Sequence, residues 1–291
     1  MAARVSVTHF TDPGCPWAYS ASPSLAVLRW RFGDALEWEL VTIGLTESAD
    51  QYASRGYTPG DSAVGRMGYR RFGMPLQVAA RTRLMATARG CRAIVATRLR
   101  HPGREHAVLR ALQFGWFTTD RLMDTPAAIG EAITWVAGIE ADAIVEAIES
   151  DEVGEAYEAD RARARTAEGS PTEAMGRSAA TDGPVRYTAP SLIFRCGDRV
   201  LDAGGFQTFE AYDVCVANLA PELPRRAPAT SALEALAAFP DGLTTQEVAV
   251  VMAPHLAPVD RRAAERELVL AHADDAVQRR ALGDDALWTL A

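Results

Sequence analysis

The sequence of 291 residues lacks several features that would define its class at once. It contains no lysine, so arginine supplies every fixed positive side-chain charge, and the formal net charge is -8. This balance argues against broad, phosphate-driven binding of nucleic acid. No apolar run approaches the ~18 residues that would span a bilayer, so no membrane partner is expected. The first residues show no charged and then apolar leader, which favours a cytoplasmic location.

Cysteine is also scarce, and no two cysteines are neighbours in sequence. The four cysteines stand at positions 15, 91, 196 and 215, with no C-x-x-C pair and no metal-ligand spacing. The sequence therefore predicts neither a metal site nor a disulfide framework. Glycine-rich nucleotide-binding loops are missing as well, so no bound cofactor is expected.

The chain is long and apolar enough for about two domains, since 48% of its residues are hydrophobic. Alternating residues in 4–10 and 36–44 predict two strands. Between them, the pattern predicts a helix from Pro16 to Gly33 with a kink at Pro23. The order strand, helix, strand favours a parallel pair.

Residues 47–180 change character, because helical periodicities follow one another with hardly a strand signal. They are expected to form an all-helical insertion. Strands return at 190–196 and 199–203, and a helix is expected over 206–220. The two halves predict one small α/β sheet in a domain of residues 1–225, with a core that includes Val5, Val7, Leu40, Leu192 and Phe194.

The proline-rich stretch "APELPRRAPATS" reads as a linker. Residues 229–291 then show three helical patterns, with Thr244 or Thr245 as an N-cap, and a hairpin around "GDD", which together resemble a winged-helix module. Residues 228–291 hold 5 Arg against 10 Asp plus Glu, a balance of 5 - 10 = -5. A DNA-reading face needs the opposite sign, so a protein contact or a lid role is favoured.

The stretch "TDPGCPWAYS" carries the strongest functional signal. If Pro16 is the first helical residue, Cys15 is the N-cap and its sulfur lies beside the free amides of Trp17 and Ala18. The helix dipole favours the thiolate, so we expect a nucleophilic Cys15 with a pKa below that of a free cysteine. The competing interpretation is a small apolar residue buried at a turn.

"FTDPGCPWAYSASPSL" and the later "TAPSLIF" resemble the active-site turn and the cis-proline loop of the DsbA-like branch of the thioredoxin superfamily, in particular its FrnE-type members. The resemblance covers most of residues 4–220. It implies a thioredoxin-like fold, a cis bond at Ala189–Pro190 with Pro190 facing Cys15, and substrate contacts from Pro16, Trp17, Ala18 and the backbone of Ala189. The departure is Ala18, where that family carries the resolving thiol.

Three functions stay open. In the first, Cys15 acts as a single thiol that forms mixed disulfides with glutathione or protein thiols, with glutathione as a co-substrate. Alternatively, the chain is closer to kappa-class glutathione transferases and hydroxychromene-carboxylate isomerases, which share this fold. A non-catalytic DsbA-like adaptor is the third interpretation, in which the C-terminal module contacts a protein partner.

Two further sites complete the sequence predictions. The amides of Gly205, Phe206 and Gln207 are expected to receive an anionic ligand before a helix. Cys91 is a candidate second thiol, because its segment resembles the inserted helix that related proteins turn toward the active-site cleft. Core packing is the competing interpretation for Cys91.

Overall fold

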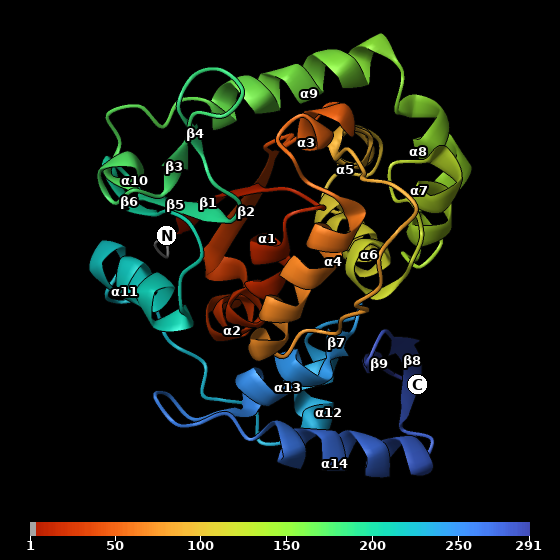
Figure 1. Ribbon diagram of the computed structural model, residues 1–291. Coiled ribbons are helices and arrows are strands. Elements are labelled where there is room, and N and C mark those ends of the chain that lie inside the picture. Colours follow the sequence, from red (N-terminus) through yellow and green to blue (C-terminus); the bar gives the residue numbers. More distant parts are fainter. Residues whose placement is uncertain (1–3) are drawn as a thin grey trace.

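The computed structural model describes residues 4–291, and Figure 1 shows a sheet unit flanked by the helices of the insertion, with the C-terminal segment packed below both. The sheet has the strand order β2-β1-β5-β6. β1 and β2 are parallel, as predicted, and the other neighbouring pairs are antiparallel. The strands are β1 (Val5–Thr11), β2 (Leu36–Thr42), β5 (Ser191–Cys196) and β6 (Arg199–Ala203).

Alternation along β1 places Val5 and Val7 on one face of the sheet, where they pack with apolar residues of α2 and α11. All five predicted core residues are at least 95% buried. The expected kink at Pro23 is a break: α1 (Pro16–Ser20) and α2 (Ser22–Phe32) separate at Ala21. Pro23 lies in the first turn of α2, where its missing N–H group leaves no bond unmade.

The insertion is helical as predicted, apart from a two-residue strand near its end. Ser178–Ala179 form the short strand β3, which pairs with β4 (Arg186–Tyr187) outside the main sheet. The predicted helix over 206–220 is shorter, because α11 (Phe209–Leu219) begins after the N-cap Thr208. The helices of the insertion are α3 (Asp50–Ala53), α4 (Pro59–Met67), η2 (Gly68–Phe72), α5 (Ala88–Arg100), α6 (Glu105–Thr118), α7 (Pro126–Ile133), α8 (Ala141–Ala147), α9 (Asp151–Ala164) and α10 (Pro171–Ala174); η1 (Gly33–Ala35) precedes β2.

The C-terminal segment has the three helices and the hairpin expected from sequence. Thr244 is the N-cap of α13, in a reciprocal capping box with Glu247. A two-residue strand, β7, was not predicted; it pairs with β9 in a sheet of order β7-β9-β8. The elements are α12 (Ala232–Ala237), β7 (Leu243–Thr244), α13 (Thr245–Met252), α14 (Arg261–Ala273), β8 (Val277–Leu282) and β9 (Asp285–Leu290).

This segment shares a hydrophobic core with the sheet unit. Val27 and Trp30 of α2 are buried in one cluster with Val248 of α13 and Trp288 of β9. The Trp30 indole N–H also donates to the carbonyl of Ala227, at 2.8 Å. The proline-rich stretch is therefore held against α2, and removal of residues 228–291 would uncover apolar side chains of the sheet unit. None of the helices within residues 4–291 is both long and apolar enough to cross a membrane.

Candidate active site

The turn after β1 places Cys15 at the N-cap of α1, with Pro16 in the first turn, as the sequence predicts. The Cys15 thiol donates a hydrogen bond to the carbonyl of Ala189, with 3.2 Å between Sγ and O. The Ala189–Pro190 peptide bond is cis. Two segments 174 positions apart thus meet at one sulfur atom.

The predicted low pKa of Cys15 is wrong for this conformation. Only 6% of Cys15 is exposed, and its neighbours in the core include Phe10, Ile43 and Ile193. Burial raises the pKa of Cys15 to about 12, and the charge of Asp12 acts in the same direction. The amides of Ala18 and Trp17 lower the pKa, as expected of a helix N-terminus, but by less. Since α1 has only 5 residues, its dipole is a weak counterweight to desolvation.

Asp12 organises the loop that carries Cys15. Its carboxylate is fully buried and accepts hydrogen bonds from the amides of Gly14 and Leu45, at 2.8 and 2.9 Å. The Thr87 hydroxyl donates to the same carboxylate at 2.9 Å, and the thiol of Cys91 does so at 3.5 Å. These bonds lower the pKa of Asp12, yet burial outweighs them and raises it. Asp12 therefore joins the active-site turn to the insertion.

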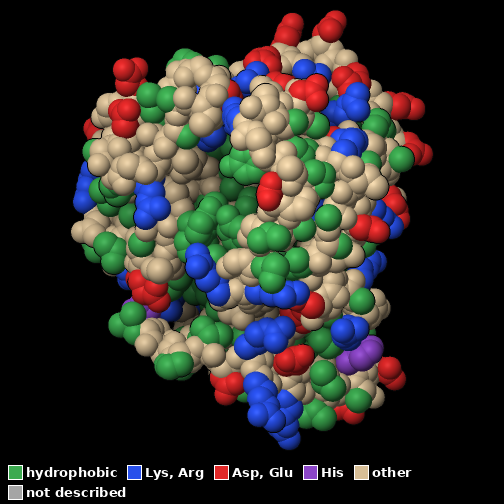
Figure 2. Space-filling view, in the orientation of Figure 1, with side chains coloured by type: hydrophobic (Ala, Val, Ile, Leu, Met, Phe, Trp, Pro, Cys, Tyr) green, Lys and Arg blue, Asp and Glu red, His purple; other side chains and the backbone are tan. Residues whose placement is uncertain are grey.

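A groove of about 540 Å³ runs beside the cis-proline loop. Trp17, Ala189, Gly205 and Phe206 form its walls, and the exposed Arg71 lies at its edge. Trp17 and Phe206 are in contact, with ring centroids 5.4 Å apart. In the view of Figure 2, hydrophobic side chains gather in the hollow at the centre of the molecule, over α1.

The other residues predicted to contact the substrate lie in different places. Ala18 is 2% exposed and packs in the same cluster as Cys15. Pro16 lines a separate hollow of about 320 Å³. The expected anion site at Gly205–Gln207 loses one of its three amides, because the Gly205 amide already donates to the Ser191 hydroxyl at 3.0 Å, and α11 begins only at Phe209. The Gln207 side chain donates to the Gly204 carbonyl at 2.8 Å and does not line the groove.

Cys91 is fully buried on α5, and its thiol is directed at Asp12. Burial raises its pKa well above the ordinary value. All four cysteines are free thiols, with Cys196 and Cys215 partly exposed. In the described chain, residues 4–291, no group of three or more His, Cys, Asp and Glu could hold a metal ion.

Sequence reasoning missed the contribution of η2 to the groove. Phe72 stacks beside Phe206 with ring centroids 4.8 Å apart, and the Arg71 guanidinium lies 4.8 Å from the Phe72 ring centroid. A second arginine, Arg177, lines the opposite side of the groove. The run "GYRRF" could have drawn attention as an aromatic and basic segment, but nothing local to it indicates that it faces Cys15.

Comparison with known structures supports the fold. A candidate protein disulfide isomerase of Nitrosomonas europaea matches with a TM-score of 0.56 and 16% identity, over 74% of this chain and 97% of its own. A candidate DsbA oxidoreductase of Streptomyces coelicolor matches with a TM-score of 0.55 and 17% identity, over 78% of this chain and 93% of its own. No protein-family model matches the sequence, and a search of curated proteins gives no match either. The chain thus has the DsbA-like thioredoxin fold, with a helical insertion.

Proposed function

We propose that the protein is a thiol-dependent oxidoreductase in which Cys15 acts alone, through mixed disulfides with glutathione or protein thiols. The observation that carries the proposal is the contact of the Cys15 sulfur with the Ala189 carbonyl, beside an open groove. Position 18, one helical turn further on, carries no thiol. The Cys15 thiol therefore has no neighbour on α1 that could displace a bound substrate.

The chemistry balances with an external thiol as the reductant. The Cys15 thiolate attacks a substrate disulfide, forms a new S–S bond and expels one substrate sulfur as a thiolate, which takes up a proton. A second thiol, such as glutathione, then attacks the mixed disulfide. It forms a disulfide with the substrate sulfur and returns Cys15 to the reduced state. Each cycle consumes one disulfide and one external thiol and produces one disulfide and one thiol, and Cys15 is regenerated.

The groove suits glutathione or a short peptide. Arg71 and Arg177 offer positive charge to carboxylates at the groove edges, while Trp17 and Phe206 offer an apolar floor. Because the thiolate is the nucleophile, the raised pKa of Cys15 makes the reaction slow near neutral pH and faster as pH rises. An extended substrate backbone that replaces the Cys15 contact to the Ala189 carbonyl would also release the thiol.

The test is mass spectrometry of the intact protein after incubation with oxidised glutathione. We expect one glutathione on Cys15 at mildly alkaline pH, removed again by reduced glutathione. The Cys15→Ala variant should take up none at that position, and Cys196→Ala is the matched control for a more exposed cysteine. Glutathione on Cys196 or Cys215 with none on Cys15 would contradict the proposal.

A second function is favoured by the neutral state of the buried thiol. A protonated Cys15 could donate its hydrogen to the thiolate of bound glutathione, as the serine at the corresponding turn does in the kappa-class transferases, the alternative relatives of this chain. Cys15→Ser separates the two proposals. It keeps a donor and would preserve a glutathione transferase activity, but it abolishes thiol–disulfide exchange.

A further inference from the structure

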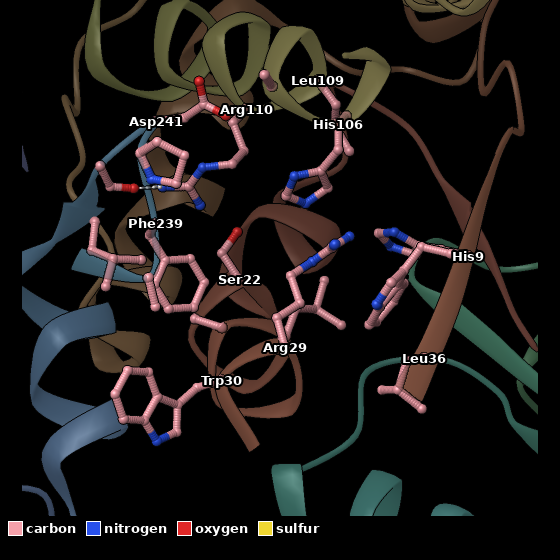
Figure 3. A pocket seen from close by; sticks show the side chains of 18 of the residues that line it. His9, Ser22, Arg29, Trp30, Leu36, His106, Leu109, Arg110, Phe239 and Asp241 are labelled. Atoms are coloured by element: carbon pink, nitrogen blue, oxygen red, sulfur yellow. Dashed lines mark hydrogen bonds between the residues drawn. The ribbon is translucent and has the colours of Figure 1, made fainter. Parts of the chain in front are cut away.

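A second cavity, of about 420 Å³, lies between α2, α6 and the C-terminal segment (Figure 3). The sheet unit, the insertion and the C-terminal segment all contribute to its walls. α2 supplies Arg29 and Trp30, α6 supplies His106 and Arg110, and the segment 239–243 closes the side next to the C-terminal module. The cavity is separate from the groove beside the cis-proline loop, with which it shares no lining residue.

Arg29 is the unusual charge in this cavity. Its Nε atom is buried and has no hydrogen-bond partner, and none of the ion pairs formed within residues 4–291 includes Arg29. The guanidinium stacks on the Trp38 ring at 4.0 Å, which covers one face and leaves its edge free. Burial lowers the pKa of Arg29 to about 10, yet it stays charged near neutral pH. Arg29 is half-buried and has no ion-pair partner among the described residues, so its open edge can receive an anion from outside the chain.

The other arginines at the cavity already have carboxylate partners. Arg110 makes a two-pronged ion pair with the buried Glu247, one bond of which is 3.0 Å. Asp241 pairs with Arg104 at 2.8 Å. Arg226 pairs with Glu234, at 3.0 Å, on the outer side. Asp34 is an exposed residue in the lining and lies in the short helix η1, in open solvent. Among the arginines that line this cavity, Arg29 is thus the one that forms no ion pair within residues 4–291.

Two histidines accompany Arg29. Figure 3 shows the Arg29 guanidinium directed between His106 and His9. Both ring nitrogens of His9 are buried without a hydrogen-bond partner. Burial, with the nearby charge of Arg29, lowers the pKa of His9 to about 3 and that of His106 well below its usual range. Both rings are therefore neutral near pH 7, and each still has one N–H group to donate.

Most of the remaining wall is apolar, with Ser22 and Gln113 as the polar exceptions. Leu25, Leu36 and Leu109 line the cavity together with Trp30 and Phe239. A volume of about 420 Å³ lies at the lower end of the range typical of small-molecule sites, roughly 300–1,000 Å³. The geometry points to a binding site for a small organic carboxylate, with its head on the free edge of Arg29 and the His106 ring and its apolar body between Leu36 and Phe239. Arg is the side chain best shaped for planar, two-pronged recognition of a carboxylate.

The test uses the full chain and defined probes: octanoate and phenylacetate, with octanamide and phenylacetamide as uncharged analogues. We expect the acids to raise the melting temperature and to bind in calorimetry, and the amides to do neither. Arg29→Met should weaken acid binding by about 10- to 100-fold, because a charge-assisted hydrogen bond is lost. His106→Phe, which keeps a ring of similar size, should weaken it less.

The controls distinguish a ligand site from a structural role. Arg100→Met removes an exposed arginine of α5 and should leave binding unchanged. Arg29→Met should stay folded in the absence of ligand, since it removes a half-buried charge that forms no ion pair and keeps an apolar side chain against Trp38. Equal binding by acids and amides, undiminished binding by Arg29→Met, or binding of no acid to the wild type would each overturn the proposal. This inference does not depend on the proposed chemistry of Cys15.

Discussion

The buried thiol of Cys15 predicts a specific loss of stability at alkaline pH. In the folded state burial raises the pKa of Cys15 from 9.0 to about 12. Between these two values the unfolded chain releases this proton and the folded chain keeps it. The folded state then binds more protons, so its stability falls as pH rises. The contribution is fully present below pH 9 and is lost progressively up to about pH 12.

The size of the stability loss follows from the shift in the pKa of Cys15. At about 1.4 kcal/mol per unit, a difference of three units amounts to roughly 4 kcal/mol once pH exceeds both values. At pH 10.5, halfway through the window, the loss is about 2 kcal/mol. Cys91 is buried with a raised pKa as well and contributes its own loss, so the wild type alone cannot isolate Cys15.

The assay is urea unfolding of wild type and Cys15→Ala between pH 7 and pH 11. The free energy of unfolding of the wild type should fall more steeply, and the difference between the two proteins should change by about 2 kcal/mol between pH 8 and pH 10.5. Cys196→Ala serves as the control for a more exposed thiol. Parallel curves for wild type and Cys15→Ala would refute the reasoning, as would alkylation of Cys15 at pH 7 at the rate of a free cysteine.

Three further outcomes are expected. Asp12→Asn should lower the free energy of unfolding by roughly 1–3 kcal/mol, because its new N–H₂ group faces hydrogen-bond donors. The same variant should speed Cys15 alkylation, because the charge of Asp12 raises the pKa of Cys15. Equal stability and equal alkylation rates would contradict this expectation. Removal of residues 228–291 should lower the melting temperature and cause aggregation by exposing Trp30 and Val27, and a truncated chain as stable as the full one would show the shared core to be dispensable. The full chain should not shift duplex DNA at physiological salt, given the C-terminal balance of 5 - 10 = -5, and a salt-sensitive gel shift would overturn the charge argument.

Local patterns predicted most of the fold because they report on neighbours in sequence. The alternation of apolar and polar residues predicted β1 and β2, and the proline in the first turn predicted the start of α1. Thr244 was identifiable as an N-cap because its capping box spans only three residues. Strand β7 escaped prediction, since two residues contain no period and its pairing depends on β9, more than forty positions later.

The site was predicted less well, because its chemistry depends on distant contacts. The N-cap position of Cys15 was readable from "GCPW", but its burial depends on Val41, Ile43 and Ala164, which come from β2, the loop after it and α9. A desolvation effect of that size cannot be inferred from the turn alone. The lack of an ion pair at Arg29 could not be predicted either, since a helical arginine is usually solvated and only the fold shows that Arg29 forms no ion pair within residues 4–291.

Ala18 lies next to both Cys15 and the cavity around Arg29. This residue packs beside Cys15 and at the same time lines the carboxylate cavity, so one small side chain separates the two sites. Ala18→Cys restores a C-x-x-C spacing and should form an intramolecular disulfide that speeds turnover, because the new thiol resolves the mixed disulfide internally. Its sulfur also takes up space at the cavity wall. Carboxylate binding should therefore weaken several-fold, because atoms added at a packed position force their neighbours to move.

Ala18→Ser separates the two effects, because it adds a side-chain atom but no thiol. It should weaken carboxylate binding to a similar degree with no gain in disulfide turnover. The measurements are insulin reduction and calorimetry with octanoate, made on wild type and both variants. If both variants bind octanoate as the wild type does, Ala18 is no part of the cavity wall. If Ala18→Cys oxidises without faster turnover, the groove has diverged from a two-thiol site in more than this residue.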